Sequence, residues 1–136
     1  MNTDSFKDNE IAVVALTAKG VELGRHLKTM FPGSHLYLPE KFGPGQENEY
    51  LFLPPVKEVV DKVFRQFRYL VLIMAVGIAV RLVASQLSDK HQDPGVVVVD
   101  DAVTFAVSLL SGHIGGANKL TRRLASLLGA QPVITT

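Results

Sequence analysis

The chain has 136 residues, a length that fits a single domain with a buried core. Hydrophobic residues make up 47% of it and charged residues 20%, which is the composition of a globular protein and excludes an intrinsically disordered one. A formal charge of +1 provides no overall field for nucleic acid, so no nucleic-acid partner is expected. The absence of cysteine excludes disulfides and thiolate metal sites.

The sequence contains no signal for a membrane or for a protein-held metal. Its first ten residues lack the basic and apolar segments of a signal peptide. The longest apolar run, residues 69–80, ends at Arg81 and is shorter than the roughly 20 residues that cross a bilayer. We therefore expect a cytoplasmic protein without a membrane partner. The histidines lie far apart and show no metal-ligand spacing, so no metal site is predicted.

Apolar runs and amphipathic segments follow one another along the chain and predict strands and helices in turn. Strands are predicted over residues 11–16, 35–38, 69–74, 96–99 and 103–110, with a last, buried strand over 132–135. Helices are predicted after Thr17 up to residue 31, over 55–67, from residue 75, and over 117–128. The partial alternation of residues 35–38 suggests an exposed strand. Residues 39–55 are predicted to be a surface loop, either a lid or a family-variable insertion.

Close spacing of the strands at 96–99 and 103–110 predicts an antiparallel hairpin with a reversal at Asp100 and Asp101. These carboxylates are interpreted as turn formers rather than as an acid–base pair, because adjacent side chains of a strand point to opposite faces. The fold class predicted is α/β, a three-layer Rossmann-like open sheet that is mostly parallel and contains this hairpin. One domain, residues 1–136, accounts for the sequence.

Residues 108–118 read Ser-Leu-Leu-Ser-Gly-His-Ile-Gly-Gly-Ala-Asn and are interpreted as a strand–turn–helix junction. Gly112, Gly115 and Gly116 allow close backbone approach, and the N–H groups of a helix start favour an anion, which predicts a ligand in an open cleft. The spacing matches neither the dinucleotide nor the phosphate-loop motif. His113 is the candidate functional side chain, because ligands of open α/β sheets bind at the carboxyl ends of strands.

The glycines also have a simpler explanation, since glycines at strand-to-helix turns often serve close packing alone. A second junction of small residues, 75–81, contains Gly77 at its helix start and Arg81 at its end. Arg81 is either a surface residue whose charge reaches water or a carboxylate partner. Arg81 and His113 both follow strands expected to be central, so both are predicted to emerge at one carboxyl edge and to line one cleft.

Four stretches together resemble one family: residues 75–81, residues 89–100, the Ser-Gly-His-Ile-Gly-Gly-Ala-Asn run at 111–118, and residues 129–136. They resemble the N-terminal region of cobalt-precorrin-5A hydrolases, the G proteins of anaerobic cobalamin biosynthesis. The third stretch is the most specific, whereas residues 11–37 fit more loosely. Ser85 stands where the family is expected to prefer proline. The family continues into a C-terminal domain, so the chain is expected to be the N-terminal fragment of a two-domain protein.

The resemblance implies a carbon–carbon hydrolase that opens the δ-lactone of a ring-contracted cobalt corrinoid, releases acetaldehyde and gives cobalt-precorrin-5B. The cobalt is carried by this tetrapyrrole substrate, so no cofactor is implied. His113 is the candidate catalytic residue, because histidine commonly transfers protons near neutral pH. The candidate substrate-binding residues are Gly77, Arg81, Lys90, Ser111, Gly112, Gly115, Gly116 and Asn118. Lys119 and Arg122 are further bases that could hold substrate carboxylates.

Three other functions stay open. A non-catalytic module could bind corrinoid or another anion and present it to the C-terminal domain, and the isolated fragment is predicted to be inactive. His113 and Gly116 match the end of the D-x-H-x-x-G cobalamin motif, but Ser111 replaces its aspartate, so an axial histidine would lose its orienting partner. A nucleotide-binding regulatory domain is suggested by fold alone, and the glycine pattern argues against it.

Overall fold

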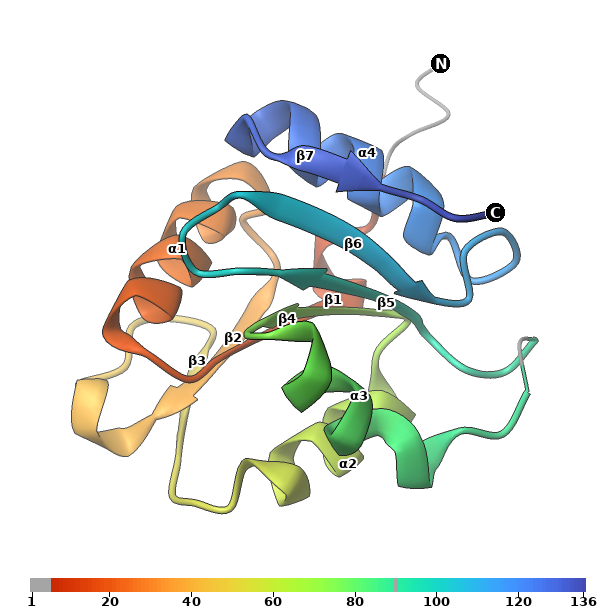
Figure 1. Cartoon of the computed structure of the whole chain (residues 1–136). Coiled ribbons are helices and arrows are strands. Elements are labelled where there is room, and N and C mark those ends of the chain that lie inside the picture. Colours follow the sequence, from red (N-terminus) through yellow and green to blue (C-terminus); the bar gives the residue numbers. More distant parts are fainter. Residues whose placement is uncertain (1–5, 90) are drawn as a thin grey trace.

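The computed structural model describes residues 6–89 and 91–136, which form one open sheet with helices on both faces (Figure 1). The strands are β1 Ile11–Ala15, β2 His35–Pro39, β3 Glu49–Phe52, β4 Tyr69–Ile73, β5 Gly95–Val99, β6 Phe105–Leu110 and β7 Gln131–Val133. The helices are α1 Ala18–Met30, α2 Val56–Gln66, α3 Val76–Val83 and α4 Ala117–Leu128. This confirms the predicted three-layer α/β fold.

The strand order is β3-β2-β1-β4-β5-β6-β7, and the sheet is mixed. Strands β1 to β5 run parallel to one another, β5 and β6 pair antiparallel, and β7 pairs parallel with β6. The last two strands therefore point opposite to the first five. The predicted hairpin is confirmed, because Val99 pairs with Ala106 and a short turn connects them.

Two apolar clusters hold the layers together, one on each face of the sheet. Alternate residues of each buried strand point to opposite faces, so Val13 of β1 packs with α1 and α4 whereas Val14 packs with α2 and α3. Strands β1, β4 and β5 are buried along their whole length. Gly24 lets α1 lie close to the sheet, since a Cβ there would come within 2.6 Å of the Leu36 side chain.

Three expectations about strands were wrong, each for a reason of tertiary context. The predicted loop 39–55 contains β3, a short edge strand whose four residues are all exposed or only partly buried and which lies between proline- and glycine-rich segments. Strand β2 is buried rather than exposed, because β3 covers its outer side. Strand β7 is mostly exposed rather than buried, because it forms the opposite edge of the sheet. Among the residues described, no helix combines the length and the apolarity needed to cross a membrane.

Candidate functional site

The glycine turn, defined here as residues 111–116, connects β6 to α4 at the edge where β4 and β5 begin. Leu110 at the end of β6 pairs with Val96, and Gly95 at the start of β5 pairs with Tyr69 at the start of β4. The turn lies directly on these strand starts, because a Cβ placed on Gly95 would lie 2.7 Å from the Gly115 carbonyl oxygen. We call this side of the sheet the amino edge.

The prediction that His113 and Arg81 emerge at the same carboxyl edge was wrong. Strand β4 is parallel to its neighbours and leads into α3 at the carboxyl edge, whereas β6 runs in the opposite direction. His113 therefore follows β6 at the amino edge, while Arg81 lies within α3 on the other side of the sheet from α4. The rule that ligands collect at the carboxyl ends of strands applies to parallel strands, and β6 is not one of those.

The expected open helix start at Gly115, Gly116 and Ala117 was also wrong in part. Helix α4 does begin at Ala117, with Gly116 before it at φ 85°. However, the Ala117 N–H donates to the Ser111 carbonyl at 3.2 Å, and the Asn118 N–H donates to the Gly112 carbonyl at 3.0 Å. The N–H groups of Ala117 and Asn118 are thus hydrogen-bonded to carbonyl groups of the turn itself and do not face an open cleft.

Close packing explains the glycines of the turn, as the simpler interpretation proposed. A Cβ on Gly112 would lie 2.6 Å from the Asn118 side-chain oxygen, and one on Gly115 would lie 2.4 Å from the Ser111 Cβ. Gly116 also has a left-handed backbone and would place a Cβ 3.0 Å from the Tyr69 ring. No larger residue fits these positions without movement of the backbone or of buried neighbours.

Asn118 is buried beside this turn, and both polar atoms of its side chain form hydrogen bonds within the protein. Its Oδ1 accepts a hydrogen bond from the Ser108 hydroxyl at 2.7 Å, and its Nδ2 donates to the Thr136 hydroxyl at 3.0 Å. Asn118 therefore positions β6, the turn and the segment after β7 relative to one another. The Ser111 hydroxyl is buried and has no hydrogen-bond partner among the residues described.

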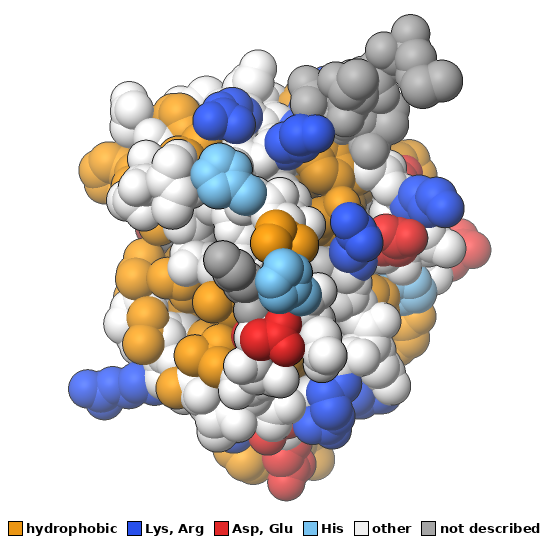
Figure 2. All heavy atoms as spheres, turned by 90° about the vertical axis from the view of Figure 1, so that its right-hand side faces the viewer, with side chains coloured by type: hydrophobic (Ala, Val, Ile, Leu, Met, Phe, Trp, Pro, Cys, Tyr) orange, Lys and Arg blue, Asp and Glu red, His pale blue; other side chains and the backbone are white. Residues whose placement is uncertain are grey.

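His113 is exposed and lines a hollow of about 280 Å³ together with Ser111, Gly112, Ile114 and Thr136. Figure 2 looks onto this side of the molecule, where histidine, basic, acidic and hydrophobic side chains all lie at the surface. Ile114 is 48% exposed, which gives the hollow an apolar rim. Within the described residues no group of three or more histidine, aspartate or glutamate side chains could hold a metal.

The other predicted binding residues that the structure describes do not gather at this hollow. Gly77 lies exposed near the start of α3, and no atom lies within 4 Å of the place a Cβ would occupy. Arg81 is exposed on the same helix. Lys90 lies outside the described residues. Lys119 and Arg122 share one outward face of α4 and line a separate hollow of about 200 Å³.

The carboxyl edge, where ligands of such sheets usually bind, has an acidic hollow in this chain. Thr17, Asp100 and Asp101 line a hollow of about 300 Å³ between the ends of β1, β4 and β5. Burial alone would raise the pKa of Asp100, but the N–H groups of Phe105 and Thr104 hold it below the ordinary value. This confirms Asp100 as a turn former. An anionic ligand would meet carboxylates here.

Asp101 also occupies the place where α1 would attract an anion. The Thr17 hydroxyl accepts a hydrogen bond from the Gly20 N–H at 2.9 Å and caps the helix, as predicted. The same hydroxyl donates to Asp101 Oδ2 at 2.9 Å. A carboxylate of the protein itself therefore lies beside the helix start, and the positive end of the helix is already compensated.

Sequence reasoning missed one cation at the amino edge, Arg68. It lies just before Tyr69, and its Nε donates to the Tyr69 hydroxyl at 3.0 Å while the guanidinium lies over the ring, 5.5 Å from its centroid. Because Gly116 packs on the same ring, Arg68 and the glycine turn share one neighbour. No local sequence pattern indicates that Arg68 lies near the glycine turn, since Tyr69 and Gly116 are far apart in sequence.

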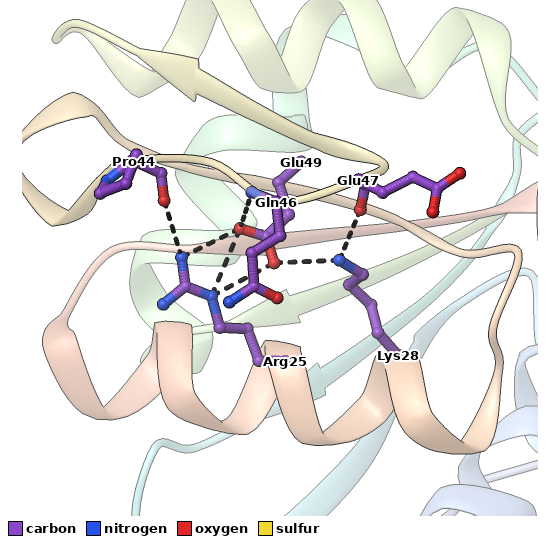
Figure 3. A network of polar contacts seen from close by, with 6 residues as sticks. All are labelled: Arg25, Lys28, Pro44, Gln46, Glu47 and Glu49. Carbon is purple, nitrogen blue, oxygen red and sulfur yellow. Dashed lines mark hydrogen bonds and ion pairs between the residues drawn. The ribbon is translucent and has the colours of Figure 1, made fainter.

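A second charged cluster, around Glu49, is structural. Figure 3 shows the Glu49 carboxylate between Arg25 and Lys28 of α1, which bind it at 3.0 Å each, while the Gln46 N–H donates to it as well. Burial alone would raise the pKa of Glu49, but these donors lower it to about 2. Its side chain is fully buried, and its ion pairs with Arg25 and Lys28 join α1 to the edge strand β3, so the cluster holds that edge in place.

Comparison with known proteins places the chain in a family. The family described as cobalamin synthesis G N-terminal matches residues 58–136, which is more than half of the chain and includes the glycine turn. This chain belongs to that family. The resemblance seen in the sequence is thereby confirmed for the N-terminal domain of the cobalamin synthesis G proteins.

Relatives with assigned names are longer proteins. The chain is 45% identical over 130 residues to the cobalt-precorrin-5A hydrolase of Priestia megaterium, covering 93% of this chain and 35% of that protein. It is 43% identical over 136 residues to the cobalt-precorrin-5A hydrolase of Salmonella typhimurium, covering 37% of that protein. The chain thus spans about a third of the length of these relatives and matches their N-terminal part.

A solved structure shares the fold. A protein from Sulfolobus solfataricus, described as a cobalamin biosynthesis protein G homolog, superposes with a TM-score of 0.71 over 96% of this chain and 39% of its own. The sequences are 23% identical, so this likeness concerns the fold alone. It agrees with the seven-stranded mixed sheet described above.

Proposed function

We propose that this chain is the N-terminal part of a cobalt-precorrin-5A hydrolase and contributes to the binding of its corrinoid substrate at the amino edge. In the proposed reaction water opens the δ-lactone, and the extruded two-carbon unit leaves as acetaldehyde. The observation that supports this proposal is the 45% identity to a protein of that name, over a segment that contains the glycine turn. His113 is the side chain proposed to move a proton.

A second candidate, a binding module without catalytic groups, is favoured by one feature of His113. Its imidazole is exposed and no side-chain hydrogen bond to it is found among the described residues, whereas a general base is usually oriented by a second group. If His113 does act as the base, as in the first candidate, we infer that the group that orients it would come from the C-terminal two thirds of the longer relatives. In that case this chain supplies part of a site that lies between two domains.

A chimera tests both candidates. This chain would replace the N-terminal third of the Salmonella typhimurium relative, and acetaldehyde release from cobalt-precorrin-5A would be measured. We expect activity in the chimera, none in the isolated chain, and a large loss of turnover for His113→Ala in the chimera. Unchanged turnover in that variant would leave the binding module as the function of this chain. A folded but inactive chimera would argue against the hydrolase assignment itself.

A further inference from the structure

The amino edge needs a cation if it receives a carboxylate-bearing substrate. Within the described part of the chain, the cations predicted from sequence, Arg81, Lys119 and Arg122, do not provide it. Arg81 belongs to α3, which begins at the opposite edge and lies on the other face of the sheet from α4. Lys119 and Arg122 point outward from α4. Arg68 differs from these three because it directly precedes β4, the strand on which the glycine turn rests.

The guanidinium of Arg68 is held in place by one of its nitrogens, and its other two nitrogens form no hydrogen bond with the described residues. Its Nε donates to the Tyr69 hydroxyl and lies 3.9 Å from Glu10. Its two terminal nitrogens have no hydrogen-bond partner among the residues described, and the side chain is 59% exposed. The hydrogen bond from Arg68 to Tyr69 raises the pKa of the guanidinium. The exposed end of the fork is therefore preorganised for two parallel bonds to a carboxylate.

Tyr69 connects this arginine to the candidate site. A Cβ on Gly116 would lie 3.4 Å from the Tyr69 hydroxyl oxygen, the atom that receives the Arg68 hydrogen bond. His113 is three residues from Gly116, so the two Cα atoms lie within about 11 Å of each other. A macrocycle with carboxylates around its rim could contact both His113 and Arg68.

We propose that Arg68 binds a peripheral carboxylate of the corrinoid, with Tyr69 as the positioning residue that fixes its guanidinium beside the glycine turn. The inference rests on the proposed function, since it takes the ligand class from that proposal. Arg68 would then make the chain bind corrinoids with free carboxylate side chains more tightly than corrinoids whose side chains are amides. A purely structural Arg68 would not affect that preference.

Two cobalt corrinoids test the preference without turnover: cobyrinic acid, which carries free carboxylates, and cobinamide, whose side chains are amides. Binding to the chain can be followed by the visible absorbance of the corrinoid. We expect tighter binding of cobyrinic acid and a loss of about tenfold, or ~1.4 kcal/mol, in Arg68→Gln. Cobinamide binding should stay unchanged. Arg68→Lys should lose several-fold, because it keeps the charge but not the fork.

Tyr69→Phe separates positioning from charge, because it keeps the ring under Gly116 and removes the hydroxyl. It should weaken cobyrinic acid binding several-fold and leave cobinamide binding unchanged. The matched control is Arg65→Gln. Arg65 is an exposed arginine of α2, on the face of the sheet opposite to α4, and donates to Gln86. Its replacement should not change the affinity for either corrinoid. Circular dichroism would confirm that each variant is folded.

The possible failures can be told apart. If the wild-type chain prefers cobyrinic acid and Arg68→Gln keeps that preference, the inference about Arg68 is overturned and the proposed function stands. Equal binding of the two corrinoids by the wild-type chain would also overturn the inference alone. If the wild-type chain binds neither corrinoid, the inference about Arg68 fails, whereas the proposed function is decided separately by the activity of the chimera.

Discussion

The side-chain amide of Asn118 donates to the hydroxyl of Thr136, 18 residues further along the chain, at 3.0 Å. The same side chain accepts from Ser108, so one buried residue fixes the end of β6, the start of α4 and the segment after β7. These are also the elements around the His113 hollow, which Thr136 lines. The hollow therefore depends on Asn118 for its shape, and both polar atoms of that side chain hydrogen-bond within the protein.

Asn118→Ala should destabilise the fold by about 1 to 3 kcal/mol, because it removes two hydrogen bonds and leaves the partly buried Ser108 hydroxyl without its acceptor. Urea denaturation measures the free energy of unfolding. Thr136→Val is the matched control, since it removes only the exposed end of the network and should cost less than about 1 kcal/mol. Equal unfolding midpoints for Asn118→Ala and the wild-type chain would contradict the role given to Asn118.

Gly116→Ala should destabilise the chain more than Gly129→Ala does. Both glycines have positive φ, at 85° and 72°, and an alanine at either place costs about 1 kcal/mol or slightly more. Only Gly116 also faces a neighbour, the Tyr69 ring, whereas nothing lies within 4 Å at Gly129. We expect the clash to add about 1 to 3 kcal/mol. Thermal denaturation of the two variants side by side would show whether the difference exists.

The alternating pattern of apolar strands and amphipathic helices was sufficient to predict the layers and the hairpin. Strands β4 and β5 are buried on both faces, so each is a continuous apolar run in the sequence. The pattern missed β3, whose position depends on pairing with β2 and on the ion pairs of Glu49 with α1, contacts between residues that are distant in sequence. The hairpin also reverses β6, so His113 lies at the edge opposite to the one expected. Contacts such as Gly116 with Tyr69 depend on the tertiary fold and leave no local pattern.

Glu49 should make stability depend on pH in the acid range. Its pKa is about 2 in the folded chain against an ordinary 4.5, so its contribution is present above pH 4.5 and is lost as the pH falls to about 2. Glu49→Gln should lower the free energy of unfolding by about 2 kcal/mol near neutral pH, with the difference shrinking towards pH ~2. Urea midpoints across this range test it. Glu58→Gln, an exposed position in α2, should show no such dependence.

Asp101→Asn distinguishes the two edges of the sheet as binding sites. The substitution keeps an oxygen that can accept the Thr17 hydrogen bond and removes one negative charge from the carboxyl edge. If cobyrinic acid binds at the amino edge, its dissociation constant should not change. Binding at the carboxyl edge would instead become tighter, because repulsion between like charges would be reduced. Tighter binding by the variant would therefore argue against the amino edge as the site.

Arg81 and His113 should act independently, because α3 and the glycine turn lie on different sides of the sheet. In the chimera, His113→Ala should lower kcat, since a proton-transfer group acts mainly in the transition state. If Arg81 holds a substrate carboxylate, Arg81→Lys should raise KM instead, because a clamp binds the ground state and the transition state alike. Sites that share no partner usually combine additively within about 0.5 kcal/mol. Steady-state kinetics of both single variants and the double variant give the coupling energy, and a value well above that limit would place the two residues in one cleft after all.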